Sequence, residues 1–154
     1  MEGLPVSNNF KSVVILMAED DADDRLLAKD ALGECGMDSD LHFVENGEEL
    51  LDYLQRRGKY SQSPRPRPGL ILLDLNMPRK DGREALREIK NNPELRRIPV
   101  VVLTTSNADM DIERAYELGA NSFISKPVTF DSLVSIMRTI GQYWFATTEL
   151  PGKK

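Results

Sequence analysis

The sequence has few of the residues on which several common functions depend. It contains one cysteine and one histidine in 154 residues, so an intramolecular disulfide is impossible and no metal site can be built from several cysteines or histidines. Cys35 lies in a helix-like stretch and is predicted to be a packing residue. His42 alternates with apolar neighbours, which predicts an ordinary strand position.

Long hydrophobic runs and clusters of basic charge are also missing. The longest apolar runs, such as 98–103, are far too short to cross a bilayer, and no basic segment followed by a hydrophobic region opens the chain. The 20 lysines and arginines against 25 aspartates and glutamates give a formal net charge of -5, without a dense basic cluster. We therefore expect a cytoplasmic protein that binds neither nucleic acid nor membranes.

The length and composition fit one folded domain. A content of 40% hydrophobic and 29% charged residues is typical of an ordinary globular protein. We predict a polar lead-in over 1–11, the domain over 12–145, and a tail over 146–154 with no effector domain. Within the domain, 56–69 is predicted to be a proline-rich insertion, an extended surface loop and spacer rather than a docking ligand.

Five apolar, strand-like runs alternate with five helix-like segments. The expected strands are 13–18, 41–44, 70–73, 99–103 and 122–125. The expected helices are one that Asp23 or Asp24 caps, with Leu26, Leu27, Ala31 and Leu32 on one side, and then 48–56, 84–90, 109–118 and 130–145. This alternation predicts an α/β fold with a doubly wound, five-stranded parallel sheet and helices on both faces.

Polar residues directly follow four of the apolar runs. Glu19 and Asp20 follow the first run, and Asp74, Thr104 and Lys126 end the third, fourth and fifth. Because such sheets bind ligands outside the carboxyl ends of their strands, we expect these side chains to meet at one edge. Three clustered carboxylates repel one another unless a cation lies among them, and an all-oxygen ligand set favours Mg²⁺.

These residue types suit the transfer of a phosphoryl group. Asp74 would attack as the nucleophile and form an aspartyl phosphate. Mg²⁺ and Lys126 would offset the anionic charge, and the Thr104 hydroxyl would donate to a phosphoryl oxygen. The sequence has neither a GxxxxGK[ST] loop nor a GxGxxG turn, so the phosphoryl group is expected to come from another molecule.

With these motifs, the sequence resembles the receiver domains of two-component response regulators. The matching motifs are Glu19-Asp20, Asp74-Leu75-Asn76-Met77-Pro78, Thr104 and Lys126-Pro127, in order over about residues 13–140. The resemblance implies a flavodoxin-like fold with strand order 2-1-3-4-5 and phosphotransfer from a histidine kinase to Asp74. It also implies a metal site of Asp20, Asp74 and the Asn76 backbone carbonyl, with Glu19 acting mainly through water, and a cis Lys126-Pro127 peptide.

The resemblance further implies a conformational switch through Thr104 and Phe123. Phe123 replaces the tyrosine that is often found at the switch aromatic, and Thr105 stands where many receivers have a smaller residue. Both departures leave the size of the conformational response open. Asp21 adds a carboxylate at the metal edge, where a loop or capping role is the simpler interpretation.

Four further features are similar to the small regulators that serve bacterial and cyanobacterial phytochromes. They are the segments 74–82 and 101–106, the proline-containing insertion and the aromatic tail with Tyr143, Trp144 and Phe145. A phytochrome is therefore a possible kinase partner. Receivers resembling this chain commonly dimerise through the fourth helix, fifth strand and fifth helix, so we predict a symmetric homodimer with the three tail aromatics in its interface and Trp144 near its centre.

Two other functions fit parts of the same pattern. A Mg²⁺-dependent phosphohydrolase with an aspartyl-phosphate intermediate would use a second aspartate two residues after the nucleophile, where this chain has Asn76. A non-phosphorylated interaction module would keep only the fold, against which Asp74 and Lys126 both argue. A signalling phosphoacceptor, rather than an enzyme, is therefore the favoured function.

Overall fold

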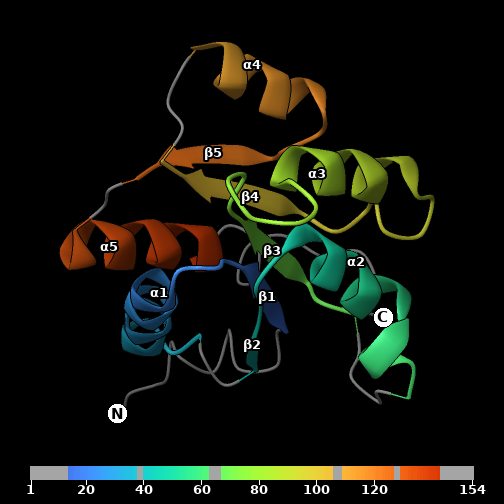
Figure 1. Cartoon of the computed structure of the whole chain (residues 1–154). Helices are drawn as coiled ribbons and strands as arrows, with labels where there is room; N and C mark the ends of the chain where they lie inside the picture. The colour runs from blue at the N-terminus through green and yellow to red at the C-terminus, as the bar shows by residue number, and fades with distance from the viewer. Residues whose placement is uncertain (1–13, 38–39, 63–66, 106–108, 127–128, 143–154) are drawn as a thin grey trace.

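The computed structural model describes residues 14–37, 40–62, 67–105, 109–126 and 129–142. Five parallel strands form one sheet in the order β2-β1-β3-β4-β5, as predicted (Figure 1). The strands are β1 (Ile15–Ala18), β2 (Leu41–Val44), β3 (Leu70–Leu73), β4 (Val100–Thr104) and β5 (Ser122–Ser125). The helices are α1 (Ala22–Glu34), α2 (Gly47–Gln55), α3 (Gly82–Asn91), α4 (Asp109–Glu117) and α5 (Phe130–Gly141), with a short 3-10 helix, η2 (Gly58–Tyr60).

Helices cover both faces of the sheet. In Figure 1, α1 and α5 lie side by side on one face, α2 and α3 lie on the other, and α4 lies next to β5 at the edge. Successive residues of a strand point to opposite faces, so Leu16 and Ala18 of β1 pack with α2 and α3, whereas Ile15 and Met17 pack with α1 and α5. This arrangement explains why the three central strands, β1, β3 and β4, are continuous apolar runs.

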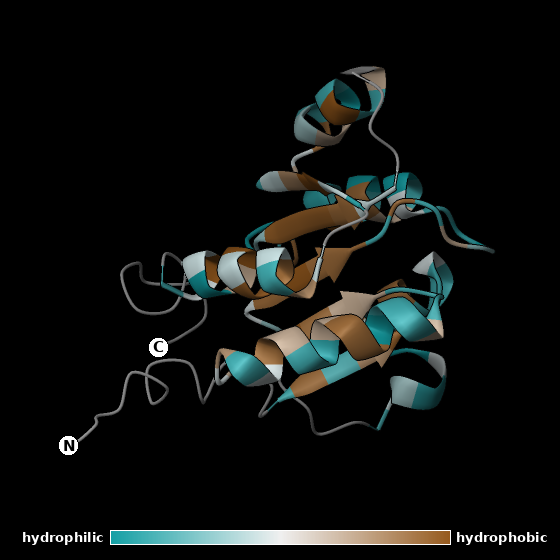
Figure 2. Cartoon of the chain, turned by 90° about the vertical axis from the view of Figure 1, so that its left-hand side faces the viewer, coloured by the Kyte–Doolittle hydropathy of each residue, from teal (hydrophilic) through white to brown (hydrophobic). Residues whose placement is uncertain are grey.

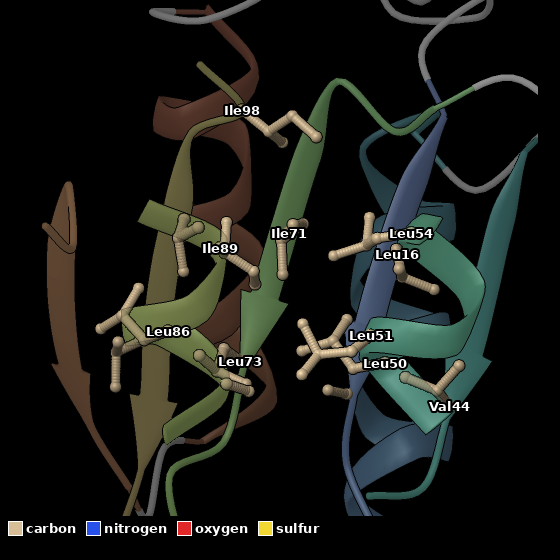
Figure 3. Packing of buried hydrophobic residues seen from close by; sticks show 14 of the residues in the cluster. Leu16, Val44, Leu50, Leu51, Leu54, Ile71, Leu73, Leu86, Ile89 and Ile98 are labelled. Carbon is tan, nitrogen blue, oxygen red and sulfur yellow. The ribbon is translucent and has the colours of Figure 1, made fainter. Parts of the chain in front are cut away.

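Two apolar layers therefore stabilise the fold. In Figure 2 most of the sheet is hydrophobic, and it lies between helices that carry many hydrophilic residues. Figure 3 shows one layer from close by, with the side chains of α2 and α3 lying over β1 and β3. Its fully buried members include Leu16, Leu50, Leu54, Ile71 and Leu86.

Three details of the sequence-based prediction were wrong. Asp21, not Asp23 or Asp24, caps α1, because its side chain accepts hydrogen bonds from the backbone amides of both of these residues. Leu26 is 58% exposed and does not share the buried side of α1. The insertion is not wholly extended, since η2 forms at its start, before the first proline.

Some expectations concern residues outside the described ranges. They include the lead-in, the Lys126-Pro127 peptide, the aromatic residues Tyr143, Trp144 and Phe145, and the tail. Among the described helices, none combines the length and the apolar character that a membrane span requires.

Candidate functional site

The register of the sheet places the predicted site residues next to one another. Ala18 pairs with Leu73, and the following residues continue the ladder: the Asp74 amide donates to the Ala18 carbonyl at 3.1 Å. Thr104 pairs with Ser125, so Lys126 follows directly, and its amide donates to the Thr104 carbonyl at 2.7 Å. Parallel strands in this register bring their carboxyl-terminal residues to the same edge.

An acidic cluster with one lysine forms the centre of this edge. One oxygen each of Glu19, Asp20 and Asp74 lie within 4.8 Å of one another. The Lys126 ammonium is 2.7 Å from Glu19 Oε1 and 3.6 Å from Asp74 Oδ2. It also lies 2.8 Å from Asp24 Oδ2 of α1. These residues line an open cleft of about 500 Å³ together with the rest of 19–24, Asn76 and Thr105.

Burial and hydrogen bonds together set the pKa values of Glu19 and Lys126 in this cluster. Glu19 is 1% exposed, and burial raises its pKa to about 7, although the hydrogen bond from Lys126 opposes this shift. Burial also disfavours the charged form of Lys126, but hydrogen bonds to Asp24 and Glu19 outweigh it and raise the pKa of the ammonium above its usual range. Lys126 is therefore cationic at neutral pH, and it only partly compensates the carboxylates around it.

The start of α1 fixes the acidic segment after β1. Asp21 accepts two backbone hydrogen bonds as the helix cap, and its own amide donates to Glu19 Oε2 at 3.2 Å. Arg25, one turn into the helix, donates to the Glu19 carbonyl oxygen at 2.9 Å. Asp20, which lies between them, is exposed and faces the cleft. The chain thus holds Glu19 inside the sheet edge and leaves Asp20 accessible.

The loop after β3 is held close to Asp74. Asp74 Oδ1 accepts a hydrogen bond from the Asn76 amide at 3.0 Å. Asp81 caps α3, and the Gly82 amide donates to the Leu75 carbonyl at 3.0 Å. A β-carbon at Gly82 would collide with the Asp74 carbonyl oxygen, so this close approach requires glycine.

The Asn76 side chain reaches the end of β4. Its amide group donates to the hydroxyl of Thr104 at 3.1 Å and to that of Thr105 at 3.3 Å. Thr104 is fully buried, and it is Thr105 that lines the cleft. Phe123 of β5 is partly buried, and its backbone amide donates to the Tyr116 hydroxyl of α4 at 3.1 Å.

The site fits a divalent cation. Three carboxylates meet there, one of them buried with a raised pKa, and no His or Cys ligand lies among them. Hard oxygen donors of this kind suit Mg²⁺ or Mn²⁺. A cation would complete the charge compensation that Lys126 begins.

Sequence reasoning missed two residues of this edge. Asp24 was treated only as a candidate helix cap, yet it is a partner of Lys126. The side chain of Asn76 was not considered, although it joins the β3 loop to β4. Neither contact has a sequence signal, because both depend on how α1 and the loop are oriented relative to the sheet.

A doubly wound sheet with acidic residues and a lysine at its strand ends is typical of domains that bind or accept a phosphoryl group. The model of the response regulator receiver domain family matches residues 15–138. The chain therefore belongs to this family, whose members are signalling proteins that are typically phosphorylated on an aspartate. Receiver domains bind a divalent metal at an acidic pocket.

Several relatives are similar over most of their length. The response regulator Rcp1 of Synechocystis sp. is 44% identical over 138 residues, which are 90% of this chain and 92% of Rcp1. The Mn²⁺-bound form of Rcp1 aligns with a TM-score of 0.81 over 91% of this chain and 99% of the solved chain.

Two further relatives differ in the process that they serve. The phosphorylated cyanobacterial phytochrome response regulator RcpA aligns with a TM-score of 0.82 and 41% identity, over 91% of this chain and 99% of the other. The probable methanogenesis regulatory protein FilR2 of Methanothrix harundinacea is 37% identical, over 90% of this chain and 88% of FilR2.

Proposed function

We propose that this protein is a phosphorylation switch in which Asp74 accepts a phosphoryl group from a histidine kinase. The observation that carries the proposal is the position of Asp74. Its carboxylate lies 3.6 Å from the Lys126 ammonium and within 4.8 Å of two further carboxylates that could share a cation with it, at the wall of an open cleft. A nucleophilic carboxylate beside cationic groups is what an incoming phosphoryl dianion requires.

The transfer step uses residues at the strand ends. An oxygen of Asp74 forms a bond to phosphorus, the P–N bond to the donor imidazole breaks, and its electron pair stays on the ring nitrogen. Lys126 lines the cleft, where it would bind a phosphoryl oxygen. The Thr104 hydroxyl is buried and accepts a hydrogen bond from Asn76, so it would donate to another phosphoryl oxygen only after turning toward the cleft. The backbone amide of Asn76 donates a hydrogen bond to Asp74 Oδ1, which orients the carboxylate.

The metal is proposed to be Mg²⁺. Asp20, Asp74 and the backbone carbonyl of Asn76 would hold the ion, with Glu19 acting mainly through water. When bound, Mg²⁺ would neutralise part of the charge that develops on the phosphoryl oxygens. The all-oxygen ligand set supports this choice, as does the hard, hydrated character of the ion.

The kinase is proposed to be a phytochrome or a kinase that a phytochrome controls. The similarity to Rcp1 and to the phytochrome response regulator RcpA supports this assignment. Output is proposed to be a change of partner binding, with Thr104 and Phe123 linking the site to α4, β5 and α5. On this face Met110 and Tyr116 of α4 are exposed at 79% and 49%, which supports a homodimer through these elements.

The central experiment is phosphorylation by acetyl phosphate, followed by intact-mass measurement. Wild type should gain one phosphoryl group in the presence of Mg²⁺ and little without it. Asp74→Asn should gain none and stay folded, because an amide keeps the shape of the carboxylate but is not a nucleophile. Retained labelling of this variant would move the acceptor elsewhere.

The same experiment separates the alternative functions. A stable adduct that decays slowly supports the switch. Rapid, continuous release of phosphate would instead indicate a phosphohydrolase. Absence of any adduct would indicate an interaction module.

A further inference from the structure

One contact of the site has no part in the transfer step described above. Asp24 lies on α1, and its Oδ2 atom is 2.8 Å from the Lys126 ammonium. We propose that Asp24 is a positioning residue that holds Lys126 away from Asp74 before phosphorylation, and so sets how readily the site accepts a phosphoryl group. This inference rests on the proposed function of Asp74 as the acceptor.

The distances show how the ammonium is divided among its neighbours. Lys126 donates to Glu19 at 2.7 Å and to Asp24 at 2.8 Å, both of which are charge-assisted hydrogen bonds. Asp74 Oδ2 lies 3.6 Å away, beyond hydrogen-bond distance. The ammonium therefore forms hydrogen bonds to two carboxylates that do not accept the phosphoryl group, and only a longer ion pair with the one that does.

Burial decides which of these two contacts gives way. The Glu19 side chain is 1% exposed, so water cannot replace the hydrogen bond that it accepts from Lys126. The Asp24 side chain is 35% exposed, so water can solvate it once Lys126 leaves. Asp24 is thus the partner from which Lys126 is released when a phosphoryl oxygen competes for it.

The contact with Lys126, and not its negative charge alone, distinguishes Asp24 from the other carboxylates of α1. Asp23 precedes Asp24 on the same helix, carries the same charge and also lines the cleft. Within the part of the chain that the structure describes, Asp23 has no ion pair with Lys126. Neutralising Asp23 therefore changes the net charge of the cleft by the same amount and leaves the Lys126 contact in place.

The test compares initial rates of phosphorylation by acetyl phosphate at saturating Mg²⁺. In this reaction an Asp74 oxygen bonds to phosphorus, the bridging P–O bond breaks, and acetate leaves with the electron pair. Asp24→Asn should reach its half-maximal rate at a concentration of acetyl phosphate about threefold lower than wild type, the scale of a partly exposed ion pair. Asp23→Asn should change this concentration less, and its effect should vanish at high salt. Asp24→Glu, which keeps the carboxylate, should remain near wild type.

A double-mutant cycle isolates the contact from other effects. In a Lys126→Gln background, where no ammonium is left to position, Asp24→Asn should behave like Asp23→Asn. The melting temperature of each variant shows that it is folded. Equal effects of Asp24→Asn and Asp23→Asn in the wild-type background at every salt concentration would overturn the inference while leaving Asp74 as acceptor. A wild type that is not labelled at all would overturn the proposed function, and the inference with it.

Discussion

At the scale of single residues, the site is set by side chains that hold one another before any ligand arrives. The side-chain amide of Asn76 donates to the hydroxyl groups of both Thr104 and Thr105, which connects the loop after β3 to the end of β4. If the Thr104 side chain turns toward a phosphoryl oxygen, it loses the hydrogen bond from the Asn76 side chain. The Asn76 side chain therefore opposes the switch that the Thr104 hydroxyl is proposed to make.

We predict that Asn76→Ala strengthens the binding of beryllofluoride, a phosphoryl analogue, in the presence of Mg²⁺. The expected gain is about fivefold in affinity, because one neutral hydrogen bond contributes about 1 kcal/mol. The Asn76 backbone carbonyl, the proposed metal ligand, remains in the variant. Calorimetric titration measures the affinity.

Thr105→Val serves as the control for this prediction. It removes the weaker of the two hydrogen bonds from Asn76 and leaves the one to Thr104, so its effect on the affinity should be smaller. Unchanged or weaker binding by Asn76→Ala would show that this side chain does not restrain Thr104.

The residues at the strand ends could be predicted from the sequence, but their contacts could not. Glu19, Asp74 and Lys126 follow apolar runs, and parallel strands bring such positions together. The pairing of Lys126 with Asp24 rather than Asp23 depends on the rotation of α1 about its axis. The capping role that the sequence allowed for Asp21 is confirmed, but the sequence pattern does not show which of the two following aspartates faces Lys126.

At the scale of elements, one glutamate connects α2 to the insertion that follows it. Glu49 accepts hydrogen bonds from the Tyr60 hydroxyl at 2.6 Å and from the Glu45 amide at 2.9 Å, and its carboxylate is 3.1 Å from Lys59 Nζ. Burial disfavours its ionised form, but these bonds outweigh that cost and hold the pKa of Glu49 below its ordinary value. The helical turn η2 is thereby attached to α2.

We predict that Glu49→Gln lowers the free energy of unfolding by about 1 kcal/mol at neutral pH. A pKa that is lower in the folded state means that the stabilisation is present above the pKa of the unfolded chain. It is lost as the pH falls through the folded-state value, so wild type and variant should converge in acid. Urea unfolding at several pH values measures this difference.

Glu48→Gln is the matched control for Glu49. Glu48 precedes it on the same helix, is more than half exposed and forms an ion pair with Arg79, a kind of contact that contributes little. Equal losses in both variants, or a loss that persists in acid, would contradict the assignment. The sequence indicated a spacer here because of its prolines, and it gave no sign of η2, whose side-chain contacts to α2 arise only in the fold.

At the scale of the whole molecule, the large exposed apolar side chains among the described residues lie in two regions. Met110 and Tyr116 of α4, with Phe130 at the start of α5, lie in the elements of the proposed dimer interface. Leu26 lies on α1, which packs beside α5 on the opposite face of the sheet from α2 and α3. Leu26, which lies outside the elements of the proposed interface, therefore serves as a control for self-association.

We predict a symmetric homodimer with Trp144 near its centre, which a phosphoryl analogue tightens. Sedimentation velocity of wild type at increasing concentration, with and without beryllofluoride, measures the association. Trp144→Ala should weaken it by about tenfold or more, the scale of a central aromatic residue in an interface. Leu26→Ala removes an exposed apolar side chain of α1 and should leave the dimer unchanged. A wild type that is monomeric in both states, or a Trp144→Ala variant that dimerises as well as wild type, would rule out this interface. Output would then depend on a different partner of the same switch, because the transfer to Asp74 does not require a second copy of the chain.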